Sequence, residues 1–202
     1  MEFLNLQDNN IIVPSIKKFY SNHYNAQKFL DIRFFDNKLS LRIFNWFCVN
    51  YAKKHQIYYR IRNGTEKNIF NVYHSYKLHL KTYKKKMFDP INRGEQIVAR
   101  YQSPVYHNND MIEITTSLCQ LNFFKWAIEN MVFKYIENHH DKIFADMQEI
   151  YMQQYSSESK AKRAKDYKRN ELSENIYNKI QLIFPDNSEE YLYDNTLSPL
   201  TI

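Results

Sequence analysis

The 202-residue chain carries 28 Lys and Arg against 22 Asp and Glu, which gives a formal net charge of +6. Its 14 Phe, 17 Tyr and 2 Trp suffice for a packed core, so the composition excludes a chain that is disordered throughout. Only two glycines occur, Gly64 and Gly94, and this excludes glycine-rich phosphate loops and most nucleotide-using enzymes.

The first half of the chain begins with a polar segment, 1–15, which contains Pro14 and predicts a flexible arm. A helical pattern starts at Asn37 and ends near His55, where cations complement the helix dipole. Its apolar face is formed by Leu39, Ile43, Trp46, Phe47 and Tyr51. The β-prone segment 57–62 then predicts a strand, followed by the turn signal Asn63-Gly64.

Segment 69–87 has the clearest periodicity in the chain. Its apolar residues follow one another at alternating spacings of four and three, which predicts an amphipathic helix with a buried seam. The seam consists of Ile69, Tyr73, Tyr76, Leu80, Tyr83 and Met87. Asp89-Pro90 ends the helix, because a residue that precedes proline is disfavoured in the helical region.

The second half predicts two short strands, 96–101 and 111–115, and then two long helices. Ser117 with Gln120 three residues later resembles a capping box that opens a helix from 118 to about 138. A further helix is expected over 141–155. Beyond Ser156-Ser157, six cations fall within 160–169, and a short helix over about 173–184 precedes an acidic tail.

These elements predict an α+β fold, a predominantly helical single domain with a small antiparallel sheet. We expect a flexible arm (1–15), a core domain (16–155), a basic linker or helix (156–172) and a C-terminal helix with an acidic tail (173–202). No apolar run reaches the roughly 18 residues of a membrane span, so we expect no membrane association. Cys48 and Cys119 lie in apolar helical patterns, which predicts reduced core thiols in an intracellular protein.

Positive charge is concentrated in one quarter of the chain. Residues 51–100 hold 12 Lys and Arg against 3 Asp and Glu, whereas residues 101–150 hold 3 against 7. The abundance of Asn, Lys, Ile, Tyr and Phe is typical of an AT-rich genome, but a uniform codon bias does not explain this contrast between neighbouring segments. The opposite charges also predict head-to-tail contact between copies, and hence a homo-oligomer.

The predicted nucleic-acid-binding surface is the lysine-rich face of the 69–87 helix. Cations that lack acids one turn away repel one another, and a phosphate backbone compensates by releasing counterions. The candidate contacts are Lys77, Lys81, Lys84, Lys85 and Lys86, extended by Arg60, Arg62, Arg93 and Arg100, with Lys162, Arg163 and Lys165 in the second cluster. Without base-reading signatures, they predict sequence-independent DNA contacts. Tyr58, Tyr59 and Tyr101 are candidates either for base stacking or for packing across strands.

The sequence gives no support for catalysis. The cysteines form no Cys-x-x-Cys pair, the histidines share no helix face, and the carboxylates of 129–149 are typical of a solvated helix face. We therefore expect a non-enzyme with no catalytic residues, no cofactor, no metal and no small-molecule substrate. Two other interpretations of the lysines remain: a solvated face enriched by codon bias, and a surface that docks on an acidic protein.

Three segments together resemble a small basic protein family of the giant viruses, the nucleocytoplasmic large DNA viruses. They are 39–54, 76–93 and 115–130, and their specific parts are Phe88-Asp-Pro90 after the lysine-rich helix and the run from Gln120 to Trp126. The resemblance covers about residues 38–147. Where related sequences carry a further basic residue after Asp-Pro, this chain has Ile91-Asn92-Arg93, so that Arg93 alone matches that position.

The resemblance implies a role like that of the gamadin-type proteins, which package viral DNA in place of histones. It also implies a location in the virion interior and in the viral factory of the host cytoplasm, or in the nucleus. The alternatives are a structural or assembly protein of the virion whose basic helix docks on an acidic partner, and a subunit of a transcription complex.

Overall fold

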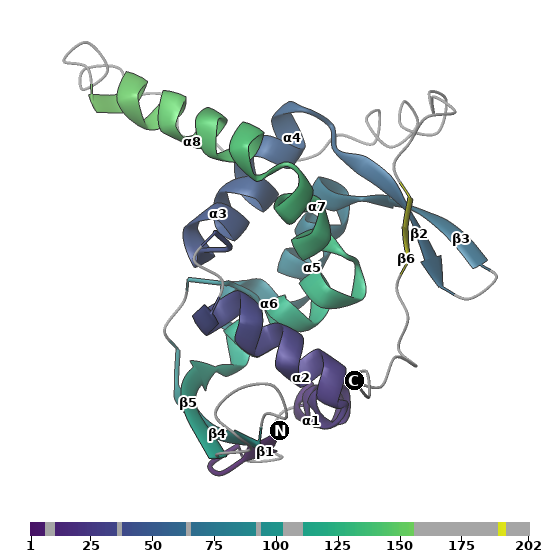
Figure 1. Ribbon diagram of the computed structural model, residues 1–202, viewed down its shortest axis with the longest axis vertical. Helices are drawn as coiled ribbons and strands as arrows, with labels where there is room; N and C mark the ends of the chain where they lie inside the picture. The colour runs from purple at the N-terminus through teal and green to yellow at the C-terminus, as the bar shows by residue number, and fades with distance from the viewer. Residues whose placement is uncertain are drawn as a thin grey trace.

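The computed structural model describes residues 1–6, 11–35, 38–63, 66–91, 94–102, 111–155 and 190–192 (Figure 1). The helices are α1 (Val13–Ser21), α2 (His23–Leu30), α3 (Leu41–Trp46), α4 (Ala52–Lys54), α5 (Val72–Met87), α6 (Leu118–Glu129), α7 (Val132–Asn138) and α8 (His140–Tyr155), with π-helical turns η1 (Asp31–Phe35) and η2 (Phe47–Tyr51). The strands are β1 (Glu2–Phe3), β2 (Tyr58–Asn63), β3 (Glu66–Asn71), β4 (Gln96–Gln102), β5 (Met111–Ser117) and β6 (Glu190–Leu192). The predicted α+β, mainly helical single domain is confirmed.

Helix α6 lies at the centre of the core. Nearly all of its side chains are buried, and it packs against α1, α2, α5 and α7. A helix with apolar residues on most of its sides is stable only when other elements cover it. Phe124 meets Phe29 and Phe44 with ring centroids 5.6 and 5.3 Å apart, which joins α6 to α2 and α3.

The Phe88-Asp-Pro90 stop is held against α6. The Phe88 ring is fully buried and lies 5.3 Å from Phe123 and 5.5 Å from Trp126, measured between ring centroids. Two buried amides of α6 donate to the backbone of this stop: Asn122 Nδ2 to the carbonyl of Met87 at 2.8 Å, and Gln120 Nε2 to that of Pro90 at 3.0 Å. The specific parts of the family resemblance therefore meet in the core, where they fix the end of α5.

A three-stranded antiparallel sheet of order β1-β4-β5 closes the lower end of the molecule in Figure 1. The strands predicted over 96–101 and 111–115 are confirmed as β4 and β5, which pair antiparallel from Gln96↔Ser117 to Gln102↔Met111. The prediction of a flexible arm over 1–15 is wrong in two places. Glu2–Phe3 pairs with β4, and α1 already begins at Val13, because Pro14 is tolerated in the first helical turn.

A second sheet has the order β3-β2-β6. Its hairpin corrects the predicted start of the lysine-rich helix: Ile69 belongs to β3 and is 48% exposed, and α5 begins at Val72, capped by the Asn71 side chain. Within the predicted acidic tail, β6 pairs in parallel with β2 and buries Tyr191 against Tyr59, 4.9 Å between ring centroids. The rest of the predicted linker and C-terminal helix lies outside the described residues.

The long helix predicted over 118–138 is two helices. Met131 has a left-handed backbone, φ 55°, which ends α6 and starts α7. The predicted capping box is also wrong, because the Ser117 side chain caps no backbone N–H and Gln120 is turned toward Pro90. The helix predicted over 141–155 is confirmed as α8.

The helix predicted from Asn37 begins at Leu41, where Ser40 accepts a hydrogen bond from the backbone of Ile43. Its second half is the π-helical turn η2. Cys48 on η2 and Cys119 on α6 are buried free thiols, and burial raises the pKa of Cys48. In the part of the chain that the structure describes, no helix is long and apolar enough to cross a membrane.

Candidate functional site

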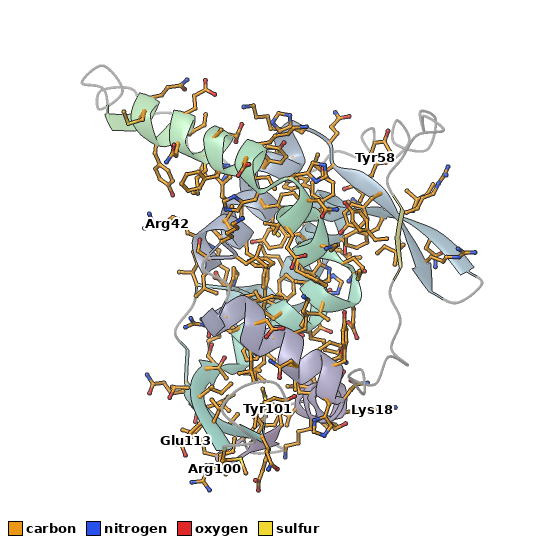
Figure 2. All side chains as sticks on the ribbon, in the orientation of Figure 1. Lys18, Arg42, Tyr58, Arg100, Tyr101 and Glu113 are labelled. Atoms are coloured by element: carbon orange, nitrogen blue, oxygen red, sulfur yellow. The ribbon has the colours of Figure 1, made fainter. Side chains whose placement is uncertain are left out.

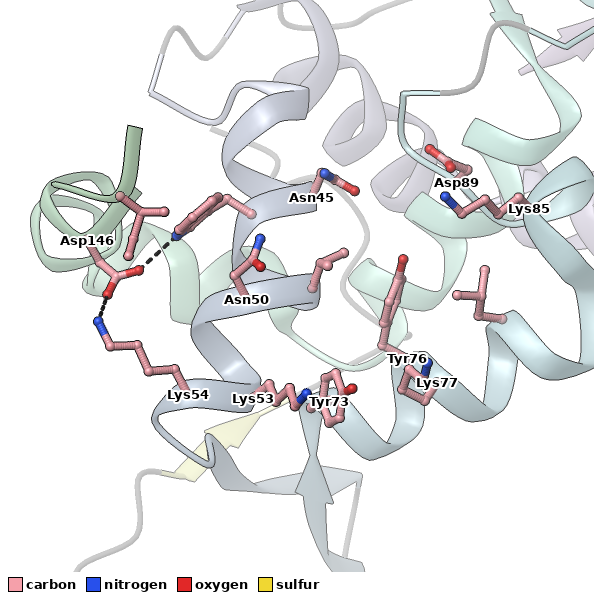
Figure 3. Close-up of a pocket in the computed structure, with 14 residues that line it drawn as sticks. Asn45, Asn50, Lys53, Lys54, Tyr73, Tyr76, Lys77, Lys85, Asp89 and Asp146 are labelled. Carbon is pink, nitrogen blue, oxygen red and sulfur yellow. Dashed lines mark hydrogen bonds and ion pairs between the residues drawn. The ribbon is translucent and has the colours of Figure 1, made fainter. Parts of the chain in front are cut away.

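A surface groove lies between the α3–η2–α4 segment and α5, and α8 closes one end (Figure 3). Its volume is about 690 Å³, within the roughly 300–1,000 Å³ typical of ligand sites. The groove is lined by Asn45, Trp46, Val49, Asn50, Lys53, Lys54, Tyr73, Tyr76, Lys77, Leu80, Lys85, Asp89, Asp146 and Ile150. We call it the lysine groove.

Asp146 of α8 closes one end of the lysine groove. This carboxylate is 8% exposed, accepts a hydrogen bond from Trp46 Nε1 at 3.0 Å and forms an ion pair with Lys54. His55 Nε2 lies 3.6 Å away from it. Burial alone raises the pKa of Asp146, but the hydrogen bonds from Lys54 and Trp46 outweigh it, so the pKa is lowered. The cluster ties α8 to the α3–η2–α4 segment.

The middle of the groove contains cations without a counter-ion. Lys53 lies over the Tyr73 ring, 5.8 Å from its centroid, and Lys77 projects from α5 one turn further along. Neither ammonium forms an ion pair with any side chain that the structure describes. At the far end, Lys85 lies beside Asp89 (Figure 3).

The lysine stripe predicted on α5 is partly assembled. Lys77 and Lys81 share one face of the helix, and Lys81 is exposed. Lys84 has a non-helical backbone, φ 57° and ψ 168°, so it leaves the stripe, and the exposed Lys85 and Lys86 follow beyond this kink. The seam beneath the lysines is confirmed at Tyr76, which is buried, and at Tyr73, Leu80 and Tyr83, which pack against the core.

The arginines do not form one extension of the stripe. Arg60 and Arg62 lie on β2 and alternate with the buried Tyr59 and Ile61, so they project from the outer face of the hairpin. Arg100 lies on β4 at the opposite end of the molecule (Figure 2), and its Nε is 3.1 Å from the Glu113 carboxylate. The expectation that Arg100 extends the basic surface is therefore wrong.

Four predicted contacts, Arg93, Lys162, Arg163 and Lys165, lie outside the described residues. Two of the tyrosines considered for stacking are core residues. The hydroxyl of Tyr59 donates to the carbonyl of Asn130 at 2.6 Å, and that of Tyr101 donates to the carbonyl of His23 at 3.3 Å. Both rings are buried, so only Tyr58 stays partly accessible on the hairpin.

Sequence reasoning missed the wall of the groove opposite α5. Asn45 and Lys53 fall off the apolar face of the helix predicted from Asn37, and Lys53 suits the end of that helix; no prediction was made for Asn50. All three line the groove opposite α5, and Asn50 lies on the π-helical turn η2, which no local pattern announces. The one available signal was the position of Lys53 and Lys54 within the basic quarter of the chain.

The fold and the groove define a small, mainly helical α+β protein with a cationic surface groove. The chain belongs to a family of unknown function, DUF7197, which it matches over residues 2–190. It is similar to uncharacterized protein L507 of Acanthamoeba polyphaga mimivirus, with 32% identity over 179 residues. The similarity covers 88% of this chain and 64% of the relative, so the chain spans slightly less than two thirds of the relative's length.

No solved structure matches the chain. The giant-virus relationship implied by the sequence resemblance is confirmed by the mimivirus relative.

Proposed function

We propose that the protein binds the phosphate backbone of nucleic acid without reading its base sequence, and that it packages or condenses viral DNA. The observation that carries this proposal is a group of lysines without counter-ions beside one groove. Lys53, Lys77 and Lys81 form no ion pair with any described side chain, and Lys86 beyond the kink shares this property.

The electrostatic argument is direct. Like charges at i and i+4 on a helix destabilise it, and α5 contains no Asp or Glu to offset Lys77 and Lys81. A nucleic-acid backbone supplies the missing negative charge, and each neutralised phosphate releases condensed counterions. Arg60 and Arg62 on the hairpin add cations on a second element.

The test is a salt series with the full chain and a labelled DNA duplex of arbitrary sequence. We expect tight binding at low salt, equal affinity for unrelated sequences, and a linear fall of log K with log salt whose slope counts the phosphates contacted. Absence of binding to duplex and single strands at low salt would refute the proposal.

A second candidate is docking on an acidic protein of the virion. Leu78 favours it, because this side chain is 55% exposed between Lys77 and Lys81, and protein interfaces use such apolar contacts. This function predicts a partner that binds more tightly than DNA at physiological salt, with an affinity that depends on Leu78. Replacing Leu78 with Ser would then weaken the protein complex and leave DNA binding unchanged.

A further inference from the structure

The lining of the lysine groove includes apolar side chains as well as lysines. Apolar or aromatic side chains, among them Val49, Tyr76 and Leu80, line the same space as Lys53 and Lys77. Val49 is 37% exposed, although the other apolar residues of η2, Phe47, Cys48 and Tyr51, are buried. A surface that served phosphate contact alone needs no apolar lining, so the groove is suited to a ligand that is both anionic and partly apolar.

Two amides complete the groove. Asn45 projects from α3 and Asn50 from η2, and both side chains line the space opposite α5 (Figure 3). A carboxamide presents a donor and an acceptor together, the combination that pairs with the edge of a nucleobase. A nucleotide has an apolar base face, a polar base edge and a phosphate. These three parts match the apolar, amide and cationic side chains of the groove.

The local backbone gives an argument independent of charge. The turn η2 is π-helical, a conformation that is rare and is found frequently at functional sites. It buries Phe47, Cys48 and Tyr51 and leaves the consecutive residues Val49 and Asn50 exposed at the groove. The π turn thereby brings an apolar contact and an amide to the same place.

We propose that the lysine groove takes the bases of an unpaired nucleic-acid strand, with Lys53 and Lys77 on the flanking phosphates. This inference rests on the proposed function and deepens it. In a duplex the base faces are stacked and the pairing edges are occupied. The remaining base edges lie at the floor of the DNA grooves, out of reach of a concave protein surface, so a duplex presents only its phosphates to the lysine groove. A single strand also offers its bases to Val49, to the partly exposed Tyr73 ring and to the two amides, and proteins of this type combine a cationic groove with ring contacts.

The experiment compares a fluorescent oligo(dT) with a duplex of the same length by anisotropy at one low salt concentration. We expect the single strand to bind more tightly. The neutral variant Asn45→Ala/Asn50→Ala should weaken single-strand binding by about fivefold to tenfold, the effect of losing one or two hydrogen bonds, and leave duplex binding unchanged. The matched control is Asn138→Ala, an exposed asparagine at the end of α7. Thermal unfolding of each variant verifies that it is folded.

A second readout locates the strand. An oligonucleotide with photoreactive 4-thiothymidine should crosslink to the peptide that contains Asn45 and Asn50. Equal affinities for the two ligands, no effect of the amide variant and crosslinks elsewhere would overturn this inference and leave the proposed function intact. Failure of both ligands to bind would overturn the proposed function itself.

Discussion

The lysines of α5 and those of α6 and α7 differ in how their charge is balanced. Lys125 pairs with Glu129 on the same helix, and Lys134 with Glu137, whereas Lys77 and Lys81 have no described acidic partner. All four lie on helices near the surface, so exposure does not explain the difference. The proposed function assigns the missing negative charge beside Lys77 and Lys81 to a nucleic-acid backbone.

Two neighbouring lysines of the lysine groove, Lys53 and Lys54, also differ in whether an acidic side chain neutralises their charge. Lys54 is tied to Asp146, which in turn holds the Trp46 indole, so this lysine serves the attachment of α8. Lys53, its neighbour in sequence, contacts only the Tyr73 ring among the described groups. The adjacent lysines therefore differ in their surroundings: a carboxylate holds Lys54, and Lys53 has no acidic partner among the described residues.

The largest effect is expected from removing the unbalanced lysines together. The triple variant Lys53→Ala/Lys77→Ala/Lys81→Ala should lose most of its DNA affinity at moderate salt, and the slope of log K against log salt should fall by roughly two to three. The control Lys125→Ala/Lys134→Ala removes balanced lysines and should keep the wild-type slope. Equal losses of DNA affinity and of salt slope in the two variants would show that an acidic partner on the same helix does not decide which lysines bind DNA.

The next effect concerns the buried end of the groove. Asp146→Ala leaves the Trp46 indole N–H and the Lys54 ammonium without their carboxylate and should destabilise the fold by about 2 kcal/mol at neutral pH. Because the native pKa of Asp146 lies below the ordinary 3.8, its contribution is complete above that value and is lost as the pH falls through the native pKa. Chemical denaturation should therefore give a difference between the proteins that shrinks below about pH 4. A difference that grows on acidification would contradict this assignment.

A smaller effect is expected at the kink of α5. Lys84 adopts φ 57° and ψ 168°, a conformation that favours glycine, so Lys84→Gly should stabilise the protein by about 1 kcal/mol. Lys81→Gly, in the regular part of the same helix, should destabilise it by about 1 kcal/mol. Denaturation midpoints of the two variants test the pair, and a loss of stability in both would show that Lys84 is not strained.

The smallest effect is expected from a balanced pair. Lys134 and Glu137 are three residues apart on α7, and the Lys134 side chain is 46% exposed, so Lys134→Ala should change stability by at most about 0.5 kcal/mol. High salt should reduce even this difference, and calorimetry at two salt concentrations measures it. A larger, salt-independent loss would mean that Lys134 supports the core.

The sequence predicted those elements whose pattern is local. The strands β4 and β5 and the helix α8 follow from alternation or helical spacing that matches what each element buries. Ile69 continues the helical spacing of Tyr73 and Tyr76, but its pairing with β2 overrides that pattern and places it in β3. The break at Met131 and the kink at Lys84 each depend on a positive φ at a residue other than glycine, which carries no sequence signal.

Of the two walls of the lysine groove, only the one formed by α5 could be predicted from local sequence patterns. Lys77 and Lys81 were found because charge and helical spacing both lie within one segment. Asn50 and Lys53 were not, because their role depends on how η2 packs beside α5, about 25 residues further along the chain. Tertiary packing of this kind is invisible to a periodicity argument.

Two charge-matched double variants separate the placement of positive charge from its total. Lys77→Glu/Lys81→Glu changes α5, and Lys17→Glu/Lys18→Glu changes α1; each lowers the net charge from +6 to +2. If the unbalanced lysines of α5 form the nucleic-acid surface, the α5 variant loses DNA binding at low salt and the α1 variant stays close to the wild type. Equal loss in the two variants would contradict the account, because binding would then follow total charge and not its placement.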